Sequence, residues 1–225
     1  MPDTISEPAK GRLLQIMRIL EGENRDFTSA ELETLTGWPR DTIRKDISFL
    51  PKAESSELAH CSGETRQGLG GSSGYAPQTL VPLIREALGL DRWGTFCVVG
   101  LGRLGSAYLN IDSSALGEFK LAAGFDTNVN RVEILVSPVP LYPAYKMGEV
   151  IRRLGIDIAL LCVPAEAAQM AAEKLAAAGI RGILNFAPVI ITVPPEITVR
   201  NVCVRDELLA LSIKMMPLCE EQGDK

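Results

Sequence analysis

The chain has 225 residues, of which 46% are hydrophobic and 23% are charged, and its formal net charge is −5. This composition is typical of a globular protein, and no apolar run approaches the roughly 20 residues that a membrane span requires. The negative charge argues against a protein that is basic over its whole surface, although it allows a local basic face.

The N-terminal third predicts a helix-turn-helix. Apolar side chains recur at i, i+3, i+4 and i+7 from Leu13, which predicts a helix over residues 10–22. A second short helix over residues 30–35 follows Thr28 and Ser29, either of which can cap its N-terminus. Gly37 ends this second helix, and a third helix follows at Pro39, so that two short helices across a tight turn indicate a helix-turn-helix.

Pro39 is expected in the first turn of a third helix, which has the pattern of a recognition helix. Ile43 and Ile47 would face the core and leave polar and basic side chains on the other faces. Arg44 and Lys45 could then contact base edges or phosphates in a major groove. A solvated helix face without a partner is the alternative, and this segment alone does not decide between the two.

Residues 51–74 are rich in Gly, Ser and Glu and predict a long loop or wing, with a plain linker as the alternative. His60, the only histidine, lies in this loop and is expected to be solvated rather than to act as a base or a metal ligand. Residues 80–90 predict a connecting helix that ends near Gly89. Trp93 is expected to pack at a domain junction.

A dinucleotide-binding fingerprint, Gly-Leu-Gly-Arg-Leu-Gly, occupies residues 100–105 after the strand-like run 96–99, and Asp126 follows about 20 residues later. Gly100 allows a sharp turn, Gly102 leaves space for a pyrophosphate beside the backbone, and Gly105 lets a helix pack closely on its strand. The helix N-terminus would direct unpaired N–H groups at the phosphates. A glycine-rich structural turn is the alternative.

Strand-like and helical runs alternate beyond the fingerprint. Strands are predicted over residues 119–125, 156–163, 180–186 and 199–204, and helices over residues 145–154 and 165–178. Residues 158–163 are apolar at every position, which is typical of a parallel sheet covered on both faces. The C-terminal part is therefore predicted to be a Rossmann-like, doubly wound parallel α/β domain.

Ligands of such sheets bind at the carboxyl ends of the strands. Asp126 is expected to accept hydrogen bonds from the adenosine ribose hydroxyls, and the next residues, Thr127 and Asn128, provide no arginine for a 2′-phosphate, so NAD is favoured over NADP. Two later strand ends are expected to wall the nicotinamide, with ordinary turn chemistry as the alternative. The expected cofactor contacts are Gly100, Leu101, Gly102, Arg103, Leu104, Gly105, Asp126, Val163, Pro164, Asn185, Phe186, Ala187 and Pro188.

Catalytic machinery is not evident beside this site. The Rossmann-like part, residues 91–204, leaves no span for a substrate domain, and no proton-shuttling side chain stands out. We predict no catalytic residue, no metal site and a sensor of the cofactor. The five cysteines lack any CxxC spacing and no basic-then-apolar leader is present, so a cytoplasmic protein is expected. The alternatives are a small NAD-dependent oxidoreductase and an NAD-binding regulator whose N-terminal domain docks a protein.

Over nearly its whole length the sequence resembles the bacterial redox-sensing transcriptional repressors of the Rex family. The resemblance is carried by Arg18–Leu20 and Ile43–Ser48 in the predicted helices, Gly74-Tyr75, Leu88–Leu90, Val99–Ala107, Val163–Gln169 and Ala178–Pro188. It implies a homodimer that represses by binding double-stranded operator DNA when NAD+ prevails and releases the DNA when NADH binds.

The resemblance also implies the domain layout. A winged-helix DNA-binding domain would span residues 1–80, a Rossmann NAD(H)-binding domain residues 81–204, and a domain-swapped helix with a tail residues 205–225. The apolar grip of the swapped helix would be Leu208, Leu209, Leu211 and Ile213. The expected DNA contacts are Arg40, Thr42, Arg44, Lys45, Ser48, Gly74 and Tyr75. The stretch between the recognition helix and Gly74 is longer than in the family, and Cys203 stands where the family has an aspartate.

Overall fold

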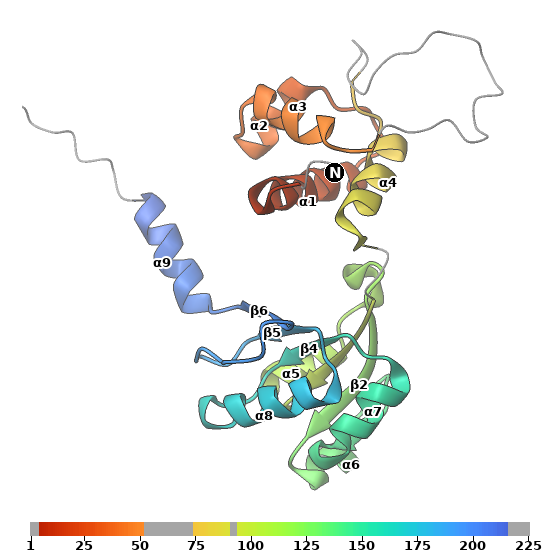
Figure 1. Ribbon diagram of the computed structural model, residues 1–225, viewed down its shortest axis with the longest axis vertical. Coiled ribbons are helices and arrows are strands. Elements are labelled where there is room, and N and C mark those ends of the chain that lie inside the picture. The colour runs from red at the N-terminus through yellow and green to blue at the C-terminus, as the bar shows by residue number, and fades with distance from the viewer. Residues whose placement is uncertain (1–4, 52–73, 91–93, 216–225) are drawn as a thin grey trace, which may run out of the picture. The chain divides into compact units, whose positions relative to one another are not determined.

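The computed structural model describes residues 5–51, 74–90 and 94–215, which belong to two compact units (Figure 1). The units divide between residues 92 and 93, and the helix after the predicted wing buries Leu80 and Ile84 in the core of the first unit. The domain bounds expected from the sequence stay a prediction. Most of the predicted wing with His60, and also Trp93, lie outside the described residues.

The described part of the first unit contains four helices: α1 (Glu7–Glu21), α2 (Ser29–Thr36), α3 (Arg40–Ser48) and α4 (Pro77–Leu88). They confirm the predicted helices, although α1 begins at Glu7 rather than Lys10. Pro39 is the residue that precedes α3, not a residue of its first turn. Gly89 ends α4 in the left-handed conformation, with φ 64°, as expected of a glycine at this position.

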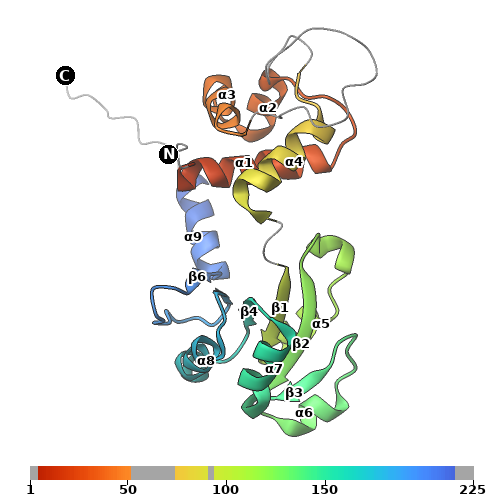
Figure 2. The ribbon, with the colours of Figure 1, turned by 45° about the vertical axis from the view of Figure 1, so that its right-hand side comes forward.

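One apolar core holds these helices together. The stripe predicted on α1, which includes Leu13, Ile16 and Leu20, packs with Ile43 and Ile47 of α3 and with α4. The views in Figures 1 and 2 agree that α1 and α4 lie side by side, with α2 and α3 next to them. This packing fixes the outward face of α3.

The second unit is built on one parallel sheet. Its strands are β1 (Thr95–Val99), β2 (Lys120–Asp126), β3 (Leu141–Pro143), β4 (Ile158–Leu161), β5 (Gly182–Asn185) and β6 (Thr198–Asn201), in the order β3-β2-β1-β4-β5-β6. Every neighbouring pair is parallel. This is the doubly wound order expected of a Rossmann fold. Strand β3 was not predicted, because three residues are too few to show a periodic pattern.

Helices cover both faces of the sheet. They are α5 (Arg103–Leu109), α6 (Val129–Ile134), α7 (Met147–Leu154) and α8 (Ala165–Ala178). Along β1, Cys97 and Val99 point into a core formed with α7 and α8, whereas Phe96 and Val98 point into a second core with Leu109 of α5. This alternation explains why the predicted strands are apolar at successive positions.

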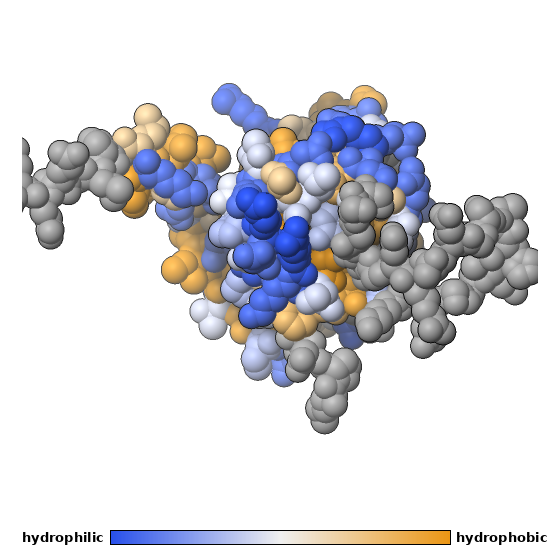
Figure 3. Space-filling model, turned by 90° about the horizontal axis from the view of Figure 1, so that it is seen from above, coloured by the Kyte–Doolittle hydropathy of each residue, from blue (hydrophilic) through white to orange (hydrophobic). Residues whose placement is uncertain are grey.

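The last described helix, α9 (Val204–Met215), buries none of its side chains in the unit. Leu208 is 58% exposed, and Leu209, Leu211 and Ile213 are also exposed. Figure 3 shows the apolar side chains of α9 at the surface, at the left of the view. Isolated apolar helices of this length are marginal in water, so α9 needs a partner surface. In the part of the chain that the structure describes, no helix is long and apolar enough to span a membrane.

Candidate functional site

The glycine-rich turn after β1 is the best-defined feature of the predicted cofactor site. Gly100 has φ +90°, and a Cβ there would lie 2.6 Å from the carbonyl oxygen of Cys162. A Cβ on Gly105 would lie 1.9 Å from the Gly100 carbonyl oxygen. These two glycines are therefore required by the packing of the turn itself.

Gly102 is different, because no atom of its surroundings lies within 4 Å of the position that a Cβ would take. Its backbone is extended, with φ −66°, so a side chain would cause no strain there. The fold thus gives no reason for a glycine at residue 102. A ligand whose phosphates approach this backbone would give one.

Asp126 lies at the carboxyl end of β2, directly beside this turn, and is only 5% exposed. Its Oδ2 accepts the Leu101 N–H at 2.7 Å, and its Oδ1 accepts the Asn128 N–H at 2.7 Å. Arg131 on α6 donates from Nη1 to Oδ2 at 2.9 Å. The sequence reasoning missed Arg131, since α6 is a six-residue helix that no pattern indicated.

These contacts set the charge of Asp126. Burial raises the pKa of the carboxyl, but the hydrogen bonds from the Asn128 N–H, Arg131 and the Leu101 N–H outweigh that effect, so the pKa lies below its usual value. The carboxylate thus ties the glycine-rich turn to the end of β2 in its charged form. It is placed where the fold expects the adenosine ribose.

The strand ends on the other side of β1 meet at the same edge of the sheet. Val163 and Pro164 follow β4, and Val163 lies within 3 Å of where a Cβ of Gly100 would be. Phe186 follows β5, and its ring lies 5.0 Å from that of Tyr108 on α5. The structure therefore brings the predicted glycine, aspartate and wall segments together at one edge.

Two predicted wall residues have buried side chains. Ala187 is 6% exposed, and Asn185 is wholly buried with its amide engaged by neighbouring groups of the chain. Burial raises the pKa of the nearby Cys162 thiol to about 12, which keeps it protonated and unreactive. Among the described residues no group of three His, Cys, Asp or Glu side chains is arranged to hold a metal ion.

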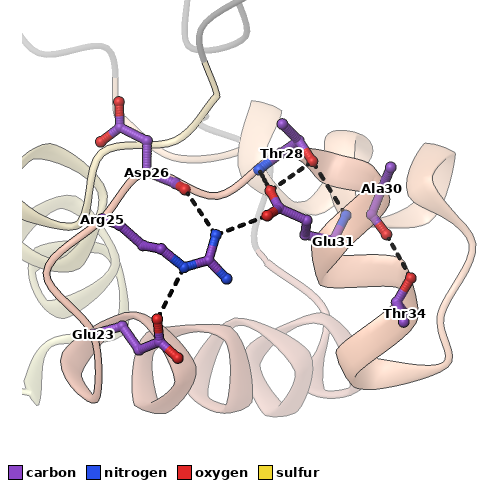
Figure 4. A network of polar contacts seen from close by, with 7 residues as sticks. All are labelled: Glu23, Arg25, Asp26, Thr28, Ala30, Glu31 and Thr34. Atoms are coloured by element: carbon purple, nitrogen blue, oxygen red, sulfur yellow. Dashed lines mark hydrogen bonds and ion pairs between the residues drawn. The ribbon is translucent and has the colours of Figure 1, made fainter.

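The predicted DNA-binding surface belongs to the first unit, where the start of α2 is firmly fixed (Figure 4). Thr28 Oγ1 accepts the Glu31 N–H at 3.2 Å, and the Glu31 carboxylate accepts the Thr28 N–H at 2.8 Å, a complete capping box. Arg25 bridges Glu31 and Glu23. Of the two caps that the sequence left open, Thr28 is the one used.

On α3, Ile43 and Ile47 face the core as predicted, and Arg44, Lys45 and Ser48 are exposed. Arg40 is also exposed but is paired with Glu33, whose Oε2 lies 3.4 Å from Nε. Thr42 is partly buried. The exposed face of α3 is therefore basic, as a helix that enters a major groove requires.

Gly74 and Tyr75 occupy a different environment. Tyr75 pairs with Phe27 through two backbone hydrogen bonds, and its side chain is only 6% exposed within the core of the unit. Gly74 has φ +92°, and a Cβ there would lie 2.9 Å from the Phe27 carbonyl oxygen. Both residues thus have a structural role at the base of the predicted wing, and their contact with DNA stays a prediction.

Comparison with known proteins identifies the family of the chain that carries these two surfaces. Residues 93–189 match the profile described as a CoA binding domain. The redox-sensing transcriptional repressor Rex of Thermus thermophilus is 38% identical over 224 residues, which covers 94% of this chain and 94% of that protein. The chain belongs to the Rex family.

Solved structures of the Rex family have the same architecture. RSP, a Rex-family repressor, in complex with β-NADH superposes with a TM-score of 0.75 and 28% identity over 94% of each chain. RSP in complex with β-NAD+ and operator DNA superposes with a TM-score of 0.76, covering 94% of this chain and 92% of that one. The expected family and the combination of a winged helix with a Rossmann-like sheet are confirmed. The individual site residues stay predictions.

Proposed function

We propose that this chain represses transcription by binding operator DNA and that the ratio of NADH to NAD+ controls this binding. The observation that carries the proposal is the pairing, in one Rex-family chain, of a basic α3 face with a turn whose Gly102 is left open for a ligand. The related RSP is known with NADH and, separately, with NAD+ and operator DNA. Rex-family proteins are regulators, so the cofactor acts as a signal and is not turned over.

The cofactor would lie across the carboxyl ends of β1, β2, β4 and β5. Its pyrophosphate would rest on the turn Gly100–Gly105, and its adenosine ribose would lie beside Asp126. Phe186, Pro188 and the Val163-Pro164 pair would wall the nicotinamide. An apolar wall favours the neutral dihydronicotinamide over the cationic nicotinamide, because burying an unpaired charge is costly. That difference is what a redox sensor requires.

The DNA would be contacted by the exposed face of α3. Arg44 and Lys45 would reach base edges and phosphates, and Arg40, Thr42 and Ser48 would flank them. Gly74 and Tyr75, at the base of the predicted wing, would lie near the DNA backbone. Two such heads must be about one helical turn of DNA apart, which requires a homodimer.

The homodimer would be completed by α9. Its exposed apolar residues support the proposal that residues 205–216 pack on the partner subunit, as the family resemblance implies. A rotation at this interface would change the spacing of the two α3 helices and release the DNA. A protein with this function would work in the cytoplasm.

The test is a titration of the full chain on a fluorescently labelled palindromic promoter duplex at fixed salt, followed by anisotropy. NADH is expected to weaken binding by at least about tenfold, in the usual range of coupling between sites, whereas NAD+ at the same concentration is not. A scrambled duplex is the control. Binding that is equal with NADH and NAD+, or absent for every promoter duplex, would contradict the proposal.

A further inference from the structure

Asn185 lies at the end of β5, at the centre of a small polar cluster. Its side chain is 0% exposed. Its Nδ2 donates to the Val189 carbonyl oxygen at 2.8 Å and to Asn201 Oδ1 at 2.9 Å. Its Oδ1 accepts the Ala187 N–H at 3.0 Å. An asparagine amide has two N–H donors, and both are used here, so none is left for a cofactor.

These bonds hold two segments that are distant in the sequence. The bonds to Ala187 and Val189 fix the loop 186–189, which is the proposed nicotinamide wall. The bond to Asn201 fixes the last residue of β6, and the Asn185 carbonyl oxygen also accepts the Val202 N–H at 2.8 Å. One buried residue therefore holds both the wall loop and the exit of the edge strand.

The exit of β6 is also the root of α9. Only Val202 and Cys203 separate Asn201 from Val204, where α9 begins. The Cys203 carbonyl oxygen in turn accepts the N–H groups of the first turn of α9. A displacement of the wall loop that moves the Asn185 amide would thus reach α9 through two residues.

At this end β6 is held by the Asn201 side chain and by the backbone bond of Val202. It is a four-residue edge strand that is mostly exposed, and in the described sheet it pairs with β5 alone. Asn201 is itself exposed, but its Oδ1 is the acceptor for one N–H of the buried Asn185 amide, and this bond holds the pair in one geometry.

We propose that Asn201 is a positioning residue that transmits the state of the nicotinamide wall to the root of α9. The inference rests on the proposed function, because it assigns the coupling step between cofactor and DNA. NADH would change the loop 186–189, the Asn185 amide would follow, and its bond to Asn201 would displace the start of α9. Neither asparagine needs to touch the cofactor or the DNA.

The test compares Asn201→Leu, which has a similar size but no acceptor, with Asn201→Asp, which keeps an oxygen for Asn185 Nδ2. Thr198→Val, at the other end of β6, is the matched control. For each full-length variant, two quantities are measured: the affinity for NADH, and the ratio of operator Kd values with and without saturating NADH.

We expect Asn201→Leu to bind NADH and free operator within about threefold of the wild type and to lose most of the NADH effect, so that the ratio falls toward one. Asn201→Asp and Thr198→Val should keep the wild-type ratio. In hydrogen exchange, NADH should change protection of the Ala187 N–H in all four proteins. It should change protection of the Asp206 N–H, in the first turn of α9, in all except Asn201→Leu.

A wild-type ratio in Asn201→Leu would overturn the inference, as would a loss of NADH affinity in parallel with the ratio, which would assign Asn201 to the pocket. If Asn201→Leu is unfolded by circular dichroism, Asn201→Ser replaces it, because its shorter hydroxyl does not reach Asn185; an unchanged ratio would overturn the inference equally. A wild-type protein that binds NADH but ignores it on DNA would contradict the proposed function and, with it, this inference.

Discussion

Arg12 of α1 holds Asp46 of α3 in a two-pronged ion pair. Arg12 Nε donates to Oδ2 at 2.6 Å and Nη2 donates to Oδ1 at 2.9 Å, and the Asp46 side chain is 4% exposed. The hydrogen bond to Asp46 raises the pKa of Arg12, against a smaller effect of burial. Asp46 lies on the buried face of α3, and Arg44 and Lys45 lie on the outer face of the same helix. The pair therefore fixes the rotation of that face, and it neutralises Asp46, which then does not offset the charge of Arg44 and Lys45.

Asp46→Asn tests whether the orientation of α3 or the charge on α3 has the larger effect on operator binding. It should lower the free energy of unfolding by about 1–2 kcal/mol, because a charge-assisted fork becomes a weaker contact. A lost negative charge would by itself strengthen DNA binding, whereas a rotated α3 would weaken it. We expect the second effect to dominate, with about tenfold weaker operator binding and unchanged NADH affinity.

Asp41→Asn is the matched control for this prediction. Asp41 is on the same helix but 91% exposed, at 4.0 Å from Arg44. Its replacement removes the same charge without touching the fork, so operator binding should be unchanged or slightly tighter. Anisotropy titrations and urea unfolding of both variants measure these effects. Equal operator affinity for the two variants would argue against a role of Arg12 in holding α3.

Gly102→Ala and Gly105→Ala should impair different properties of the protein, the first its NADH affinity and the second its stability. At Gly102 a methyl group meets only open space, so folding should be unaffected while NADH affinity falls by at least about tenfold through collision with the phosphates. At Gly105 a methyl group would overlap the Gly100 carbonyl, so the second unit should unfold at lower temperature. Calorimetry and NADH titration distinguish the two outcomes. A Gly102→Ala protein that is destabilised but still binds NADH would contradict the assignment.

Much of this site follows from the sequence, because its anchors are local. The spacing of Gly100, Gly102 and Gly105 after an apolar strand predicts the turn, and the apolar periodicity predicts α1, α3 and α8 within a few residues. Arg131 and the Arg12–Asp46 pair could not be predicted in the same way. Both depend on side chains that only the fold brings together. Arg131 belongs to a helix too short to show a periodic pattern, and Arg12 and Asp46 are 34 positions apart in the sequence.

Arg44→Ala and Lys45→Ala should weaken operator binding without changing NADH affinity. Both side chains are exposed on α3, so their removal should leave the stability within about 0.5 kcal/mol. If Lys45 contacts a phosphate, the slope of log K against log salt should fall by about one, while a base contact of Arg44 would cost about 1–3 kcal/mol on the operator. Lys174→Ala, exposed on α8, is the control. Unchanged salt dependence in Lys45→Ala would exclude a phosphate contact.

The capping box of α2 should make part of the stability depend on pH. Hydrogen bonds from the Thr28 N–H, Arg25 and the Thr28 hydroxyl lower the pKa of Glu31 to about 2. Because the folded pKa lies below the unfolded value, the stabilisation is fully present above about pH 5 and is lost as the pH falls toward 2. The difference in unfolding free energy between the wild type and Glu31→Gln should therefore shrink over this range. A difference that stays constant down to pH 3 would contradict the assignment.

We expect the exposed apolar face of α9 to form the interface of the dimer. Leu208 and Leu211 are one turn apart and 58% and 54% exposed, so in a dimer each would bury an apolar side chain worth about 1.5–3 kcal/mol. Leu211→Glu should give a monomer by sedimentation that binds operator weakly, since a single head reads one half-site, yet binds NADH if the cofactor site is complete within one chain. Ser212→Glu adds the same charge to the neighbouring exposed position and should remain dimeric. A Leu211→Glu protein that stays dimeric would place the subunit interface on another surface, and loss of NADH affinity in the monomer would show that the partner subunit completes the cofactor site.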